Sequence, residues 1–183
     1  IYLNNGKGEF NKRIYLPLEI NAQVSVVKSV DFNKDGLMDL MIGGRNELGK
    51  YGQSPRSYLL KNLGDDQYVD VTKEVVPDLE YLGMVKDAIW TDLDLDGNLD
   101  LVVAGEWMPI TVFINKSGKL LNETSNFGLD KSSGWWNSLA AEDLNNDGYP
   151  DIVVGNLGLN SRLKTLDNLP VKMMVKDFDQ NGS

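Results

Sequence analysis

A nine-residue pattern of acidic and amide side chains occurs three times in this 183-residue chain and limits what the chain can fold into. The central copy, residues 92–100, reads DLDLDGNLD and places carboxylates at positions 1, 3, 5 and 9. At close range these charges repel one another. A hard cation resolves the repulsion, because calcium accepts about six to eight oxygen ligands in flexible geometry. The pattern therefore predicts a calcium-binding loop, and the alternative is an Asp-rich turn without metal.

The other copies keep the oxygen donors and the glycine at position 6, which makes the sharp turn. Residues 31–39 read DFNKDGLMD, residues 143–151 read DLNNDGYPD, and residues 177–183, DFDQNGS, stop at position 7. Asn at position 3 still offers a carbonyl oxygen, and position 7 is expected to offer its backbone carbonyl. Three full Ca²⁺ sites and a fourth, partial one are expected. The predicted ligands are Asp31, Asn33, Asp35, Leu37, Asp39, Asp92, Asp94, Asp96, Asn98, Asp100, Asp143, Asn145, Asp147, Tyr149, Asp151, Asp177, Asp179 and Asn181.

An EF-hand loop also opens with this spacing of acidic residues, but it needs an acidic residue at position 12 and a helix on each side. Position 12 is occupied here by Ile42, Val103 and Val154. Each of these lies in a short apolar run that is too brief and too β-rich for a helix. The loops are therefore predicted to join strands, and the EF-hand is rejected.

The composition narrows the possible functions. The chain has no Cys and no His, which removes disulfides, the usual zinc sites and every Ser-His or Cys-His dyad. The net charge is −9, and three bound Ca²⁺ would offset about six of these charges. The sequence has no stripe of basic residues of the kind that indicates nucleic-acid binding. Calcium loops of low affinity favour an extracellular, cell-surface or periplasmic location, and no membrane span is evident.

A second motif repeats together with the acidic loops. Asn4, Asn62 and Asn115 each follow a short apolar run and precede a glycine turn, as in a β-hairpin; in residues 1–10 this motif reads as a strand, a turn and the start of a return strand. Both motifs recur at about 50 to 60 residues, a period typical of propeller blades. One strand leads into each loop, one leads out, and the hairpin supplies two more. The expected fold is all-β: a partial β-propeller of about three four-stranded antiparallel blades, with calcium loops between adjacent strands.

The expected units are residues 1–23 (the end of a preceding blade), 24–83, 84–133 and 134–183, the last irregular and truncated. The chain begins without Met and ends inside a motif, so we expect a fragment of a larger protein. Because propellers close with about four to eight blades, an open arc is expected. Its exposed blade edges allow self-association.

The acidic loop combined with the Asn-Gly hairpin resembles the FG-GAP/VCBS repeat family, which includes the propellers of integrin α-subunits. Residues 51–62, 105–115, 134–138 and 155–161 further resemble a bacterial surface branch associated with ASPIC/UnbV-type proteins. The resemblance implies a non-catalytic, calcium-stabilised binding or adhesion module of a secreted or cell-surface protein. Its partner would be a protein or a glycan. The alternative is part of a calcium-dependent propeller enzyme acting on polysaccharide, similar to a lyase.

Six residues are candidates for the ligand face: Arg45, Tyr51, Arg56, Trp107, Trp135 and Trp136. Residues 43–57 form a connection longer than a hairpin needs, and long loops on rigid scaffolds often carry binding residues. The tryptophans can stack on a sugar or a peptide, although filling the gap between tapering blades is the favoured interpretation. A lyase would need a base near a neutralised uronate carboxylate, supplied by Lys, Tyr or Arg in a shared cleft, and Tyr51, Arg45 and Arg56 are the candidates.

Overall fold

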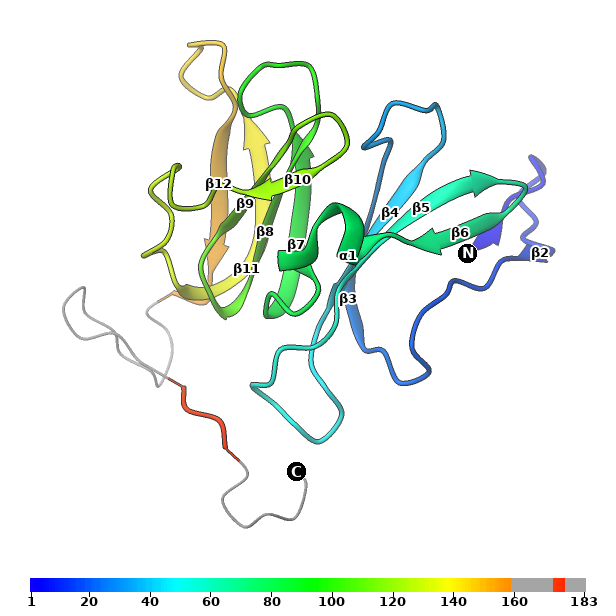
Figure 1. The fold of residues 1–183 in the computed structure, drawn as a ribbon, viewed down its shortest axis with the longest axis horizontal. Coiled ribbons are helices and arrows are strands. Elements are labelled where there is room, and N and C mark those ends of the chain that lie inside the picture. The colour runs from blue at the N-terminus through cyan, green and yellow to red at the C-terminus, as the bar shows by residue number, and fades with distance from the viewer. Residues whose placement is uncertain (159–172, 177–183) are drawn as a thin grey trace.

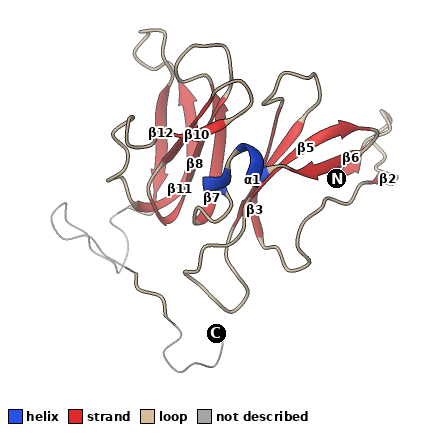
Figure 2. Ribbon diagram, viewed as in Figure 1, coloured by secondary structure: helices blue, strands red, loops and turns tan. Residues whose placement is uncertain are grey.

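The computed structural model describes residues 1–158 and 173–176, and this part of the chain is built almost entirely from antiparallel strands (Figure 1). The helical content of the described residues is a single turn, α1 (Thr72–Val75), followed by a 3₁₀ turn, η1 (Pro77–Leu79). Both lie on the connection between two sheets (Figure 2). The all-β prediction is confirmed for these residues.

The first sheet contains four strands in chain order, each antiparallel to the next. They are β3 (Val24–Val30), β4 (Asp39–Gly44), β5 (Tyr58–Gly64) and β6 (Gln67–Asp70). The β3–β4 ladder begins at the pair Val30 and Asp39, so the first acidic loop closes directly onto paired strands. This is the strand–loop–strand arrangement expected from the sequence.

The second sheet repeats this order and continues into a further hairpin. Its strands are β7 (Met84–Thr91), β8 (Asp100–Met108), β9 (Thr111–Asn115) and β10 (Leu120–Asn122), followed by β11 (Gly134–Glu142) and β12 (Asp151–Asn156). β11 pairs along its length with β12, and its first residues also pair with β8. The described residues thus form two four-stranded units and the first two strands of a third. The rest of the expected third unit lies mostly outside the described residues, and residues 173–176, which are described, form no strand.

Two apolar layers of the core lie on opposite sides of the second sheet, and a third, smaller cluster contains Ile42, Tyr58 and Leu60 of the first sheet. Leu101 and Val103 of β8 belong to a cluster shared with Met41 and Leu59 of the first sheet. Val102, between them, belongs to a cluster that packs against Leu139 of β11 and other residues of the β11–β12 hairpin. Successive side chains of a strand point to opposite faces, so the uninterrupted apolar run of β8 is explained by burial on both faces. The units therefore stack face to face.

A β-bulge recurs at one place in the first strand of each unit. The extra residue is Ser25, Lys86 or Asn137, in each case six positions before the first Asp of the following loop. A bulge bends its strand and increases the local twist. Three bulges in register show that the units repeat in backbone geometry as well as in sequence.

The N-terminal hairpin differs in detail from the sequence-based expectation. A return strand was expected to start within residues 1–10, but β1 (Tyr2–Leu3) pairs with β2 (Lys12–Arg13). The side-chain oxygen of Asn4 accepts backbone hydrogen bonds from Gly6 and Gly8, at 2.8 and 3.2 Å. These bonds form a wide turn in place of a tight one, which moves the return strand along the chain.

Candidate metal-binding loops and the opposite rim

Each acidic loop joins the first two strands of its unit, and all three lie at the upper edge of the molecule in Figure 1. In the central loop the backbone N–H groups of Asp96 and Gly97 donate to the two oxygens of Asp92, at 3.1 and 2.8 Å. Asp31 and Asp143 accept the equivalent bonds in the other loops. One loop conformation therefore occurs three times.

Backbone dihedrals explain why these sequences turn in this way. The glycine at position 6 has φ of 85°, 87° and 91° in the three loops, where a side chain would be strained. Position 4 also has positive φ, at Lys34, Leu95 and Asn146. The first carboxylate accepts N–H bonds from two turn residues and so holds the turn in place.

The ninth residue anchors each loop to its sheet. Asp100 is completely buried, and its carboxylate accepts N–H bonds from Leu93 and Asn115, both at 2.8 Å. Asp39 is buried in the same way and accepts from Phe32 and Asn62. Burial raises the pKa of both carboxyls because it disfavours the charged form. A nearby cation would favour that charged form.

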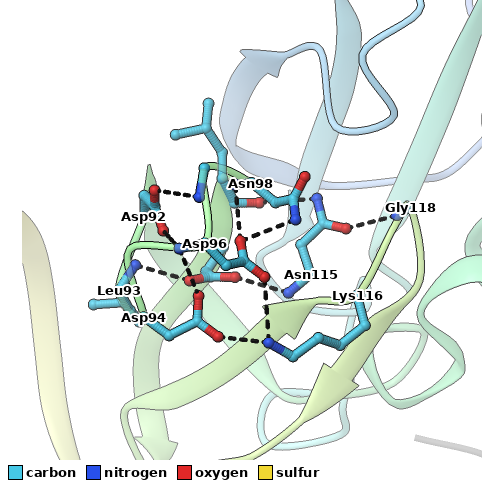
Figure 3. Close-up of polar contacts among 11 residues, drawn as sticks. Asp92, Leu93, Asp94, Asp96, Asn98, Asn115, Lys116 and Gly118 are labelled. Atoms are coloured by element: carbon cyan, nitrogen blue, oxygen red, sulfur yellow. Dashed lines mark hydrogen bonds and ion pairs between the residues drawn. The ribbon is translucent and has the colours of Figure 1, made fainter.

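The central loop gathers a set of oxygens suited to a hard cation (Figure 3). One carboxylate oxygen each from Asp92, Asp94 and Asp100 lies within 4.8 Å of the others. Carboxylate oxygens are the ligands that calcium prefers. A turn that binds no metal does not need three carboxylates to converge. These three of the expected ligands fit a divalent cation.

Position 5 behaves differently from this group. Asp96 accepts the N–H of Asn98 at 2.8 Å, and that bond is the largest cause lowering the pKa of its carboxyl. Its other oxygen lies 3.3 Å from Nζ of Lys116, which is also 2.5 Å from Asp94 (Figure 3). Bonds from the position 7 N–H likewise lower the pKa of Asp35 and Asp147. Asp96 is not part of the converging group, which consists of Asp92, Asp94 and Asp100.

The remaining expected ligands keep the status of predictions. In the loops at 31–39 and 143–151, the amide of Asn33 or Asn145 donates to the position 5 Asp. The side-chain oxygen of each Asn accepts a hydrogen bond from the backbone N–H of the same position 5 Asp. The position 7 residues Leu37, Asn98 and Tyr149 donate their N–H groups within the loop. The fourth loop, with Asp177, Asp179 and Asn181, lies outside the described residues.

Two asparagines that served only as hairpin markers in the sequence turn out to support the loops. Asn115 is completely buried; its Nδ2 donates to the carbonyls of Phe32 and Leu99, at 2.8 and 3.1 Å. Asn62, the equivalent residue in the first unit, donates to the carbonyl of Met38 at 3.1 Å. Their recurrence before each glycine turn was the available signal, but it did not reveal a contact with the loops.

The opposite rim carries an aromatic cluster that includes three of the six ligand-face candidates. The rings of Trp107 and Trp135 have centroids 5.4 Å apart at an interplanar angle of 52°. The indole N–H of Trp107 donates to the Tyr51 hydroxyl at 3.2 Å, and that hydroxyl donates to Glu106 at 2.6 Å. Glu106 also pairs with Lys86 at 2.9 Å. Sequence reasoning missed Glu106 and Lys86.

Trp107 has an unusual backbone. Met108 pairs with Gly134 and Glu106 pairs with Trp135, so Trp107 is the extra residue of a bulge between β8 and β11. Its φ is 62°, in the left-handed region where bulges commonly have glycine. A bulky residue in this region is an outlier, and such outliers cluster at functional sites.

The other three candidates do not belong to this cluster. Arg56 forms ion pairs with Glu19, Asp70 and Glu80 and lies over the Tyr58 ring, so it has a structural role. The indole N–H of Trp136 donates to the Ser132 carbonyl, and its ring packs against the second core cluster.

Arg45 is exposed, and its backbone N–H bonds the Gln23 carbonyl. Tyr51 makes its polar contacts with Glu106 and Trp107, whereas Arg56 makes its own with other residues.

Comparison with known proteins supports the repeat family. Residues 92–154 match the family described as FG-GAP-like repeat. Integrin alpha-5 of Xenopus laevis is 29% identical in an alignment 164 positions long that covers 75% of this chain and 15% of that protein. The chain thus spans a small part of its relative. The repeat match and the weak similarity to an integrin subunit support the FG-GAP family.

Within the described residues, no helix has the length and apolar character needed to cross a membrane.

Proposed function

We propose that this chain is a calcium-stabilised segment of a β-propeller that acts as a binding or adhesion module of a cell-surface or secreted protein. The observation that carries the proposal is the convergence of Asp92, Asp94 and Asp100 within 4.8 Å, in a loop conformation that recurs twice. The FG-GAP match includes this loop, and the similarity to an integrin subunit supports an extracellular binding role.

The three complete loops would hold one Ca²⁺ each, through positions 1, 3, 5, 7 and 9. A bound Ca²⁺ would supply positive charge against the clustered carboxylates. The residues of the chain do the rest: the N–H groups of Asp96 and Gly97 orient Asp92, and the buried Asp100 fixes the loop to β8. We extend the same proposal to the partial loop with Asp177, Asp179 and Asn181.

The units 24–83, 84–133 and 134–183 would be successive blades of a larger propeller, preceded by the end of another blade at 1–23. The face-to-face packing of the sheets supports this division. An arc of this kind leaves a blade face open to neighbouring blades of the parent protein or to a second copy. The resemblance of residues 51–62, 105–115, 134–138 and 155–161 to a bacterial surface branch of the family supports a bacterial parent protein.

We place the ligand face at the rim opposite the loops. Tyr51, Glu106, Trp107 and Trp135 offer aromatic surface together with a hydroxyl and a carboxylate. Aromatic rings with a polar edge are typical of protein-binding and glycan-binding surfaces. Trp107 supports this placement, because a bulky residue there has a left-handed backbone that only glycine adopts without strain.

Thermal unfolding of metal-stripped protein, titrated with calcium, tests the calcium part of the proposal. A ligand that binds only the folded state adds RT ln(1 + [L]/Kd), about 1.4 kcal/mol for each site at ten times Kd. Three sites would add about 4 kcal/mol, a large share of a typical domain's stability. The melting temperature should rise by many degrees with calcium and much less with magnesium, which demands octahedral geometry. A melting curve unmoved by calcium would refute the proposal.

A further inference from the structure

The loops at 31–39 and 92–100 belong to different units but share one buried side chain. Nδ2 of Asn115 donates to the Phe32 carbonyl, 83 positions earlier in the chain, and to the Leu99 carbonyl. Phe32 is position 2 of the first loop, and Leu99 is position 8 of the second. One amide group therefore holds the backbone of both loops.

The remaining polar groups of Asn115 fix its own position. Its backbone N–H donates to Asp100 at 2.8 Å, and its Oδ1 accepts the N–H of Gly118 at 2.8 Å (Figure 3). Because the residue is completely buried, losing any of these bonds would leave a polar group without water to replace it. Releasing either loop would therefore leave a buried polar group without a hydrogen-bond partner.

The Phe32 peptide is held on both sides. Its N–H donates to Asp39, the last residue of its own loop, while its carbonyl accepts from Asn115 of the next unit. The first loop also lies close to the second unit at its tip: a Cβ added to Gly97 would stand 3.8 Å from Nζ of Lys34. The two loops thus meet at a shared, buried contact.

We propose that Asn115 positions both loops and makes metal binding at 31–39 and 92–100 mutually dependent, so that occupation of one loop raises the affinity of the other. The inference rests on the proposed calcium binding. The physical reason is that calcium in either loop fixes the peptide bonded to Asn115, and the ordered Asn115 then holds the other loop in its binding conformation. By linkage, the effect must be equal in both directions.

Asn62 provides a matched control. It stands at the equivalent hairpin position, donates to Met38 at position 8 of its own loop, and accepts from Gly64. Its other side-chain bond goes to the Tyr68 hydroxyl of its own unit. Asn62→Ala therefore removes the same local support as Asn115→Ala without touching the loop at 92–100.

The experiment is a calcium titration of the whole chain in which NMR monitors the amide signals of Gly36, Gly97 and Gly148. Each of these N–H groups donates to the first Asp of its loop and reports on that loop alone. Asp94→Ala removes an exposed ligand of the central loop and should abolish binding there. We then expect the calcium midpoint at Gly36 to rise by about fivefold or more, while Gly148 serves as the reference.

In an Asn115→Ala background, Asp94→Ala should change the Gly36 midpoint by less than about twofold, because the connection is already absent. In an Asn62→Ala background the full shift should persist. Asn115→Ser, which is shorter but polar, replaces Asn115→Ala if the alanine variant fails to fold.

The result in the otherwise unmodified chain is decisive without any Asn115 variant. A Gly36 midpoint that does not respond to Asp94→Ala overturns the inference, as does a full shift that survives Asn115→Ala or Asn115→Ser. If none of the three glycine signals responds to calcium, the proposed function itself fails. If all respond independently, only the coupling is wrong.

Discussion

Asp87 on β7 accepts a hydrogen bond at 2.9 Å from the backbone N–H of Leu139 on β11, although these two strands are not paired. The other oxygen of Asp87 lies 2.9 Å from Nζ of Lys28 on β3. One carboxylate therefore links the first strands of all three units. No sequence motif marks this residue, since the equivalent positions hold Val26 and Ser138.

Asp87→Ala should destabilise the protein by about 1–3 kcal/mol, because it leaves the part-buried N–H of Leu139 without its partner. Lys28→Ala removes only a partly exposed ion pair and should cost less than about 1 kcal/mol. Urea unfolding of the two variants makes the comparison. Equal losses would mean that the ion pair, and not the backbone bond, joins the units.

Asp100→Asn and Asp96→Ala should separate the structural and the metal-binding roles of the central loop. Asp100 accepts two buried N–H bonds, and an amide at that position turns a donor toward one of them. We expect Asp100→Asn to lose about 1–3 kcal/mol even without metal. Asp96→Ala, at an exposed site, should leave the metal-free protein within about 0.5 kcal/mol and reduce only the calcium-dependent gain.

Thermal unfolding of both variants, with calcium and with a chelator, gives this comparison. A calcium-dependent gain that Asp96→Ala leaves intact would remove Asp96 from the ligand set. An unchanged metal-free stability in Asp100→Asn would contradict the anchoring role of Asp100.

The effect of calcium should weaken on acidification. Burial raises the pKa of Asp39 and Asp100 in the folded state. In metal-free protein, their contribution to stability is therefore fully present below the unfolded-state pKa and is lost as pH rises through the raised folded-state pKa. Calcium needs the charged form, so protons compete with it first at these two residues.

Melting temperatures measured with and without calcium, from about pH 7 downward, should converge as the pH approaches these raised pKa values, above the usual Asp value of about 3.9. The pKa of Asp35, Asp96 and Asp147 is lowered, so these groups stabilise the fold above the unfolded-state pKa and lose that contribution only as pH falls through the lowered folded-state value. A calcium effect that persists unchanged to the usual Asp value would contradict the competition.

Trp107→Gly and Trp136→Ala should differ in their effect on stability. Glycine accommodates the φ of 62° and relieves about 1–2 kcal/mol of backbone strain, which offsets the lost ring contact and the bond to Tyr51. Trp107→Gly should therefore change the free energy of unfolding by less than about 1 kcal/mol. Trp136→Ala removes a ring from the second core cluster and should cost about 3 kcal/mol.

Urea unfolding measures both values. A loss in Trp107→Gly as large as that in Trp136→Ala would identify Trp107 as a packing residue and would remove the main support for a ligand face at that rim.

The local features of this fold could be predicted from the sequence because they depend on residues close together in the chain. The acidic loops form from their own side chains and backbone N–H groups, with Gly97 and its equivalents at the turn. The apolar run after the central loop specifies a strand, β8, that is paired and buried on both faces. Strand order within a unit follows from the short connections, which favour antiparallel neighbours.

The contacts between units were decided only by the tertiary structure. Asn115 serves a loop 83 positions away, Asp87 serves a strand 52 positions away, and Trp107 meets Tyr51 across 56 positions. Such contacts depend on how one sheet stacks on the next, and this geometry is set by twist, by bulges and by packing. A hairpin asparagine, a strand aspartate and a surface tryptophan each have common local roles. Their residue types therefore do not indicate which distant residues they contact.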